Sequence, residues 1–261
     1  MDEDVIVSAD WLEAHLDDPD LVVVDVRDAW EYDGIGHVPG AVNLPFDSFR
    51  GGGERGMLPP TDEWAAMLGE RGITAETTLV AYDDTHGVFA ARFLVTALLY
   101  GHADLHLLDG DYSAWTREHG TSTETPDVEA ATYDVREPAD SPLATLDDVA
   151  AAMEDPAAVI VDTREPEEYE AGHIPGAINL DWKEAVDEET RGLKPRDEVK
   201  AIFSAKGIRP DKRVVLYCNT ARRISHTFVV LRWLGYDYVG FYEGSLTEWE
   251  SKGRPLESAE T

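Results

Sequence analysis

The chain has 261 residues, and its 53 acidic against 22 basic residues give a formal net charge of −31 at pH 7. This charge argues against nucleic acid and anionic membranes as partners, and no apolar run approaches the roughly 18 residues of a membrane span. One cysteine excludes an internal disulfide, and no basic-then-apolar segment opens the chain, so we expect a cytoplasmic protein. The acidic residues are scattered throughout, which is typical of a salt-adapted, halophilic surface.

Short β-branched runs alternate with helical stretches in both halves of the chain. We predict strands at 22–26, 79–82 and 105–108, and again at 159–162, 214–217 and 238–241. The helix after Asp83 should end at Gly101, and the helix after Cys218 at Gly235. The second of these helices carries an apolar stripe formed by Ile224, Phe228, Leu231 and Leu234. The alternation predicts an α/β fold of βαβ units, with mainly parallel sheets flanked by helices.

The second half of the chain repeats the first. Asp25, Arg27 and Tyr32 recur 137 residues later as Asp162, Arg164 and Tyr169, and the run 36–44 recurs as 172–180. A period this long indicates a duplicated domain. We expect one domain at 1–122, a linker at 123–142 that is rich in Thr, Glu, Pro and Ala, and a second domain at 143–261.

Residues present in both copies are interpreted as architectural. His37 and His173 occupy matching positions in the Gly-His-x-Pro-Gly-Ala-x-Asn element, and we expect each ring to bond to backbone. The Asp-x-Arg pairs of the two copies should form internal ion pairs or caps. By contrast, Cys218 occurs in one copy only, since Asp83 stands at its position in the other.

Cys218 is the candidate nucleophile. It ends the predicted strand 213–218, and only Asn219, Thr220 and Ala221 separate it from the next helix, which begins with Arg222 and Arg223. Unpaired N–H groups and the helix dipole favour an anion at such a place, so the thiol should ionise easily. The structural alternative is a small buried apolar residue. The sequence has no Gly-rich phosphate loop and no Cys/His cluster with metal spacing, so we expect neither a cofactor nor a metal.

Several motifs in order resemble the tandem-domain rhodanese family of sulfurtransferases. They are Asp-x-Arg, Glu-Tyr, Gly-His-Ile-Pro-Gly-Ala-Ile-Asn, a strand ending in Tyr-Cys, Ser-His-Thr, Gly-Tyr, and Glu-Gly-Ser followed by Trp249 and by 254–257. The resemblance covers nearly the whole chain and implies two rhodanese-like domains. It also implies that the C-terminal domain is catalytic and that the N-terminal domain, with Asp83, is not.

The resemblance implies the chemistry as well. In this family a cysteine thiolate takes the sulfane sulfur of a small anionic donor such as thiosulfate, and the persulfide passes it to cyanide or a thiol. Backbone N–H groups of 219–223 would ring the sulfur, and Arg222 and Arg223 would bind the sulfonate. The Cys-x4-Arg spacing from Cys218 to Arg223 gives the six-residue loop of sulfurtransferases, whereas phosphatases have Cys-x5-Arg.

The sequence departs from the family pattern at the positions that determine which donor is bound. Asn219-Thr220-Ala221 matches neither the basic residues of thiosulfate enzymes nor the Gly-Ser-Gly of mercaptopyruvate enzymes. Glu168 stands where many members place a donor-binding arginine. The basic pair Arg222 and Arg223 favours thiosulfate, so we predict a monomeric thiosulfate sulfurtransferase. A 3-mercaptopyruvate sulfurtransferase and a non-catalytic persulfide carrier are the alternatives.

Overall fold

The computed structural model describes residues 1, 4–50, 58–138 and 140–258. The chain folds into two compact units. Of the described residues, the first unit takes in those up to Ser141 together with the segment Asp187–Leu193, and the second takes in Pro142–Val186 and those from Lys194 onward. Among the described residues, no helix is both long enough and apolar enough to cross a lipid bilayer.

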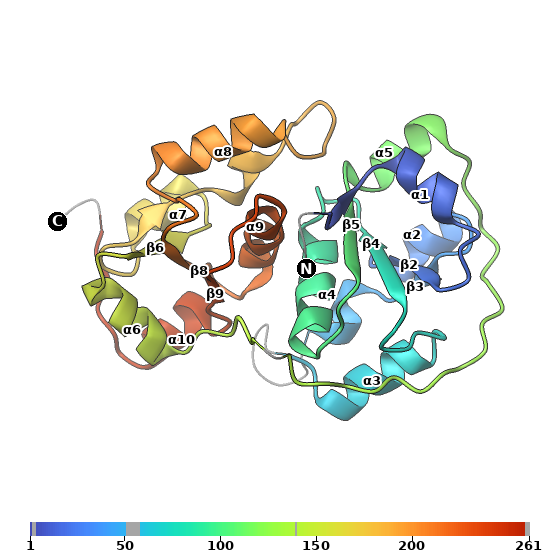
Figure 1. Ribbon diagram of the computed structural model, residues 1–261, viewed down its shortest axis with the longest axis horizontal. Helices are drawn as coiled ribbons and strands as arrows, with labels where there is room; N and C mark the ends of the chain where they lie inside the picture. Colours follow the sequence, from blue (N-terminus) through green and yellow to red (C-terminus); the bar gives the residue numbers. More distant parts are fainter. Residues whose placement is uncertain (2–3, 51–57, 139, 259–261) are drawn as a thin grey trace. The chain divides into compact units, whose positions relative to one another are not determined.

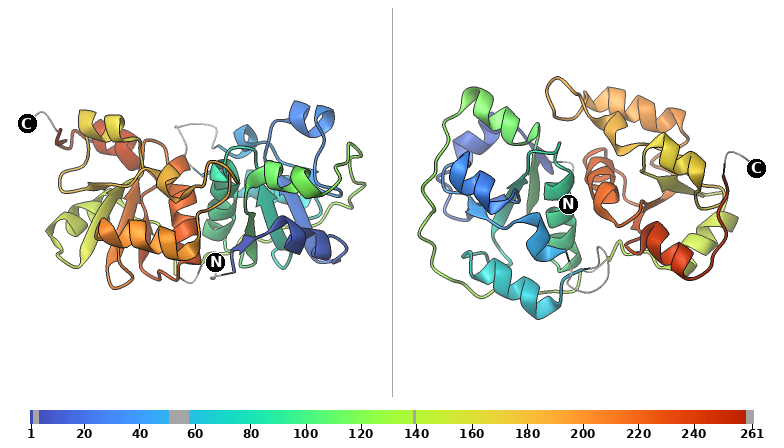
Figure 2. Two further views of the ribbon diagram at one scale, coloured as in Figure 1. Left: turned by 90° about the horizontal axis from the view of Figure 1, so that it is seen from above. Right: turned by 180° about the vertical axis from the view of Figure 1, so that it is seen from behind.

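The first unit holds a five-stranded parallel sheet in the order β1-β5-β4-β2-β3. Its strands are β1 (Ile6–Val7), β2 (Leu21–Asp25), β3 (Val42–Asn43), β4 (Thr78–Tyr82) and β5 (Leu105–Leu108). Its helices are α1 (Ala9–His15), α2 (Ala29–Gly34), the 3-10 helix η1 (Phe46–Phe49), α3 (Thr61–Gly69), α4 (Val88–Leu99) and α5 (Asp111–Glu118). Figures 1 and 2 show helices on both faces of this sheet.

The second unit holds a four-stranded parallel sheet in the order β7-β6-β8-β9. Its strands are β6 (Ala158–Asp162), β7 (Ile178–Asn179), β8 (Arg213–Tyr217) and β9 (Val239–Phe241). Its helices are α6 (Leu146–Glu154), α7 (Pro166–Ala171), the 3-10 helix η2 (Trp182–Ala185), α8 (Arg196–Ala205), α9 (Arg222–Trp233) and α10 (Ser245–Ser251). The repeated motifs thus correspond to a repeated architecture.

The period of two along each strand distributes side chains to the two faces of the sheet. In β8, Val215 and Tyr217 pack with Val149 of α6 and Trp249 of α10. The stripe of α9 is buried as predicted, and Phe228 meets Phe241 of β9 with ring centroids 5.9 Å apart. Because both faces are covered, the central strands β2, β4, β6 and β8 are mainly apolar along their length, as parallel strands in α/β folds are.

The six predicted strands are confirmed to within about one residue at each end. The three two-residue strands β1, β3 and β7 escaped prediction, because two residues are too few to show alternation. Gly101 and Gly235 follow the two long helices with φ of 82° and 84°, the left-handed conformation that a glycine adopts without strain.

Candidate active site

Cys218 lies directly after β8, at the carboxyl end of its sheet, and α9 begins four residues later. Its N–H donates to the Ser245 hydroxyl at 3.2 Å, and its carbonyl oxygen accepts from the Leu246 N–H at 2.9 Å. Ser245 and Leu246 open α10, so the start of that helix packs against the end of the strand. This contact holds the backbone of Cys218 in place from one side.

The loop after Cys218 turns sharply into α9. Ala221, the residue before the helix, is wholly buried and has a φ of 61°, a conformation that costs energy for any residue with a side chain. Its carbonyl oxygen accepts from the Ser225 hydroxyl at 2.8 Å. In the described part of the chain, no hydrogen bond is assigned to the N–H of Asn219, Thr220 or Ala221. These donors stand at a helix N-terminus, where an anion is stabilised.

The loop at the matching position in the first unit holds an anionic group in this way. Asp83 follows β4 as Cys218 follows β8, and its carboxylate is wholly buried. It accepts four backbone N–H bonds of 2.7–3.1 Å, from Thr85, Gly87, Phe89 and Ala90. Burial raises the pKa of Asp83 to about 6, against the opposing effect of these bonds. The repeated strand–loop–helix can therefore surround an anion with amides.

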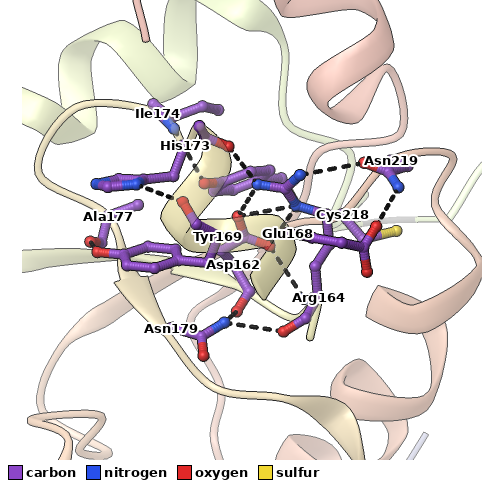
Figure 3. A network of polar contacts seen from close by, with 12 residues as sticks. Asp162, Arg164, Glu168, Tyr169, His173, Ile174, Ala177, Asn179, Cys218 and Asn219 are labelled. Carbon is purple, nitrogen blue, oxygen red and sulfur yellow. Dashed lines mark hydrogen bonds and ion pairs between the residues drawn. The ribbon is translucent and has the colours of Figure 1, made fainter. Parts of the chain in front are cut away.

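The Asn219 side chain lies between Arg164, two residues after β6, and Glu168 of α7 (Figure 3). Its Oδ1 accepts from Arg164 Nη1 at 3.5 Å, and its Nδ2 donates to Glu168 Oε1 at 2.8 Å. The other oxygen of Glu168 accepts from Arg223 Nη1. Burial acts to raise the pKa of Glu168, but the bonds from Arg223 and Asn219 outweigh it and hold this pKa below its usual value. The backbone of Asn219 is fixed as well, since its carbonyl accepts from the Thr247 hydroxyl at 2.8 Å.

Some of the predicted site residues lie in or beside the loop as expected, whereas the side chains of others are bonded to Glu168. The backbone of 218–221 forms the loop as expected, with Thr220 half-buried, and Arg222 is half-buried at the first position of α9. The side chains of Asn219 and Arg223, by contrast, are both engaged by Glu168.

Cys218 itself is buried, with 1% of its surface exposed. The residue is small and lies between the turn of Ala221 and the start of α10, which accounts for its burial.

Sequence reasoning missed Ser245 and Thr247, which hold the loop from α10. The Glu-Gly-Ser motif contained Ser245, whereas Thr247 lies two residues beyond it. In the structure Ser245 is wholly buried and has a φ of 49°. Positive φ at a non-glycine residue often marks a position that the surrounding structure constrains. Glu168 was noticed only as a departure from a pattern, and its two partners lie more than 50 residues away in the chain.

The architectural interpretations are confirmed. His37 and His173 each bond through Nδ1 to a backbone carbonyl, of Tyr32 at 3.0 Å and of Tyr169 at 2.8 Å. The two Asp-x-Arg motifs form buried ion pairs, and the Asp162–Arg164 pair has a closest approach of 2.6 Å.

One group of acidic and histidine side chains in the described residues could hold a metal ion. Ligand atoms of Asp10, Glu118 and His119 lie within 4.8 Å of one another in the first unit. Both acidic side chains are exposed, and nothing else at this place points to an ion, so we assign no metal site.

Comparison with known proteins decides the family. A model described as "Rhodanese-like domain" matches residues 8–118 and 145–252. The chain belongs to the rhodanese family. Its two copies are rhodanese-like domains, which confirms the predicted fold class, and the family resemblance inferred from the motifs is confirmed with it.

Relatives of this rhodanese carry sulfur-transfer names. It is 34% identical to the "Thiosulfate sulfurtransferase" of Corynebacterium glutamicum, over 98% of this chain and 91% of that protein. It is also 34% identical to "Sulfur carrier protein TtuD" of Thermus thermophilus, over 94% and 93% of the two chains. These similarities support a sulfurtransferase, with the donor left open.

Solved structures agree on the fold of this rhodanese. The structure of SseA from Escherichia coli, described as a 3-mercaptopyruvate enzyme, aligns with a TM-score of 0.80 and 28% identity, over 92% of this chain and 98% of that one. EanB in complex with ergothioneine aligns with a TM-score of 0.88 over 98% of this chain and 70% of that one, and at 21% identity this likeness concerns the fold alone.

Proposed function

We propose that this rhodanese is a thiosulfate sulfurtransferase that works through a persulfide on Cys218. The Cys218 thiolate attacks the outer sulfur of thiosulfate, a new S–S bond forms, and the donor's S–S bond breaks as sulfite leaves with its electron pair. Cyanide or a thiolate then attacks the outer persulfide sulfur and takes it, and the Cys218 thiolate is released. The reaction is two-step covalent catalysis with ping-pong kinetics.

One observation carries the proposal, namely the place of Cys218 between a parallel strand and a loop of available amides. The N–H groups of Asn219, Thr220 and Ala221 can stabilise the negative charge that resides on sulfur before and after transfer. In the first unit the matching loop and the first turn of α4 surround a carboxylate with four amide bonds, which supports this use of the backbone.

The two halves then have different roles. We propose 143–261 as the catalytic domain and 1–122 as a non-catalytic domain, because Asp83 supplies a carboxylate that its own loop already binds. In the catalytic half, Arg222 and Arg223 provide positive charge at the first turn of α9, where an approaching sulfonate can be received.

The burial of Cys218 affects how the donor reaches it. At 1% exposure the sulfur is reached only after neighbouring side chains move, so we expect slow alkylation by bulky reagents and fast alkylation by small ones. A buried sulfur also protects a persulfide from water and oxidants. That feature, with the similarity to a sulfur carrier, favours a persulfide carrier as the second candidate function.

The deciding experiment compares thiosulfate and 3-mercaptopyruvate as donors, with cyanide as acceptor, and follows the protein by mass spectrometry. We expect turnover with thiosulfate and one added sulfur atom on the donor-treated protein. Cys218→Ser should lose both signals while keeping the thermal unfolding of the wild type. Persulfide without turnover would favour the carrier function. A higher kcat/KM with 3-mercaptopyruvate would mean that this compound, and not thiosulfate, is the donor. Activity in Cys218→Ser would refute the mechanism through a Cys218 persulfide.

A further inference from the structure

The geometry points to Glu168 as a specificity-determining residue, whose carboxylate makes the site discriminate between sulfur donors by their charge. This inference rests on the proposed function and deepens it. It concerns how strongly a doubly charged donor such as thiosulfate is disfavoured relative to a singly charged one with the same reactive sulfur.

Glu168 is placed to act on the loop of the nucleophile. It occupies the third position of α7 and bonds with one oxygen to Asn219, the residue after Cys218, and with the other to Arg223 in the first turn of α9. The Glu168 and Arg223 side chains are 30% and 20% exposed, so their charges are only partly screened by solvent. The contacts from Arg164 through Asn219 to Glu168 are visible in Figure 3.

The ion pair removes net positive charge from the first turn of α9. Arg223 alone would attract an anion, but Glu168 compensates its charge. Coulomb energy is proportional to the product of the charges, so the Glu168 carboxylate repels a dianion twice as strongly as a monoanion at the same place. A wild-type site with this pair is therefore less selective for dianions than one with Arg223 unpaired.

The first unit offers an internal comparison. Glu31 occupies the same position in α2, but the residue it meets in the loop is Asp84, and the second position of α4 is Phe89 where α9 has Arg223. Burial and the contact with the Asp84 carboxylate raise the pKa of Glu31, whereas that of Glu168 is lowered. The amide and guanidinium partners thus belong to the half with the cysteine, and they keep Glu168 charged there.

The test measures kcat/KM for thiosulfate and for methanethiosulfonate, a singly charged donor of the same sulfane sulfur, at fixed ionic strength. Glu168→Gln removes the charge and keeps an oxygen for Asn219. We expect kcat/KM to rise about tenfold for thiosulfate and about threefold for methanethiosulfonate, since halving the donor charge halves the logarithm of the effect. Glu167→Gln removes an exposed charge from the same helical turn and should leave the ratio of the two donors unchanged.

A second pair of variants separates charge from direct contact. Arg223→Gln leaves Glu168 uncompensated and should lower kcat/KM more for thiosulfate than for methanethiosulfonate. The double variant E168Q/R223Q has the net charge of the wild type at this place, so its donor ratio should return to the wild-type value. A double variant that stays as poor with thiosulfate as Arg223→Gln would show that the charge of Glu168 does not set the donor ratio, and would overturn the inference.

Two further results have distinct meanings. If Glu168→Gln changes kcat/KM by the same factor for both donors, or for neither, the ratio of the two donors stays the same. That result would overturn the role of Glu168 while leaving sulfur transfer intact. Failure of the wild type to form a persulfide with either donor would overturn the proposed function, and this inference with it.

Discussion

Asp83→Asn tests whether the first unit contains a titrating carboxylate within its ring of amides. The carboxylate is wholly buried, and burial raises its pKa from the ordinary 3.8 to about 6. The N–H bonds from Thr85, Gly87 and Ala90 act in the opposite direction, and the nearby Asp111 carboxylate adds to the rise. Such a rise corresponds to ~3 kcal/mol between the two protonation states. Because the folded pKa lies above the unfolded one, the folded state binds the proton more tightly, and stability falls as pH rises from about 4 to about 6.

The assay is urea unfolding of the wild type and of Asp83→Asn at several pH values between 4 and 7, at constant ionic strength. The asparagine cannot ionise, so the free energy of unfolding of the wild type, minus that of the variant, should decrease by ~2 kcal/mol across this range, since the rest of the change lies below pH 4. The amide nitrogen of the variant also faces N–H donors, which costs about 1–3 kcal/mol at every pH. Asp33→Asn, at an exposed position, should follow the wild type. Parallel curves for the wild type and Asp83→Asn would refute the argument.

Three other predictions concern packing and charge. Arg164→Ala leaves Asp162 buried without its partner and should lower the free energy of unfolding, measured with denaturant, by about 3–5 kcal/mol. Arg213→Ala, in a half-exposed pair, should lower it by less than about 1 kcal/mol, and similar losses in the two variants would contradict a buried, structural role of the Asp162–Arg164 pair. Gly192→Ala places a Cβ 2.5 Å from Asp109 Oδ1 and should destabilise by about 1–3 kcal/mol, while Gly34→Ala meets nothing within 4 Å and should be tolerated. With a net charge of −31, the protein should show a Tm that rises with NaCl concentration, and a Tm independent of salt would exclude self-repulsion as a destabilising force.

Local patterns accounted for much of the fold. The strands at 79–82 and 214–217 are buried on both faces and therefore appear as short, uninterrupted apolar runs. Because His37 and His173 occur in both copies, a structural role could be predicted for them, and both rings bond to backbone as expected. Cys218 could be placed after a strand and before a helix, because the apolar residues form an uninterrupted run before it and recur with helical spacing after it.

Contacts between distant segments could not be found in the same way. Nothing near Arg191 in the sequence indicates that its side chain bonds to Asp111 at 2.8 Å, or that 187–193 groups with the first unit. The pairing of Glu168 with Arg223 joins a helix of one βα unit to a helix of another. Which side chains meet across such separations depends on the register and packing of the whole sheet.

The sequence alone therefore determined the duplication, the parallel α/β architecture and the position of the cysteine, because periodicity and repetition are properties of neighbouring residues. Only the tertiary structure decided that Asp83 lies within four amide bonds, that Cys218 is buried against α10, and that a carboxylate compensates Arg223. Charge compensation and burial depend on atoms brought together from separate elements, and a linear pattern does not contain their distances.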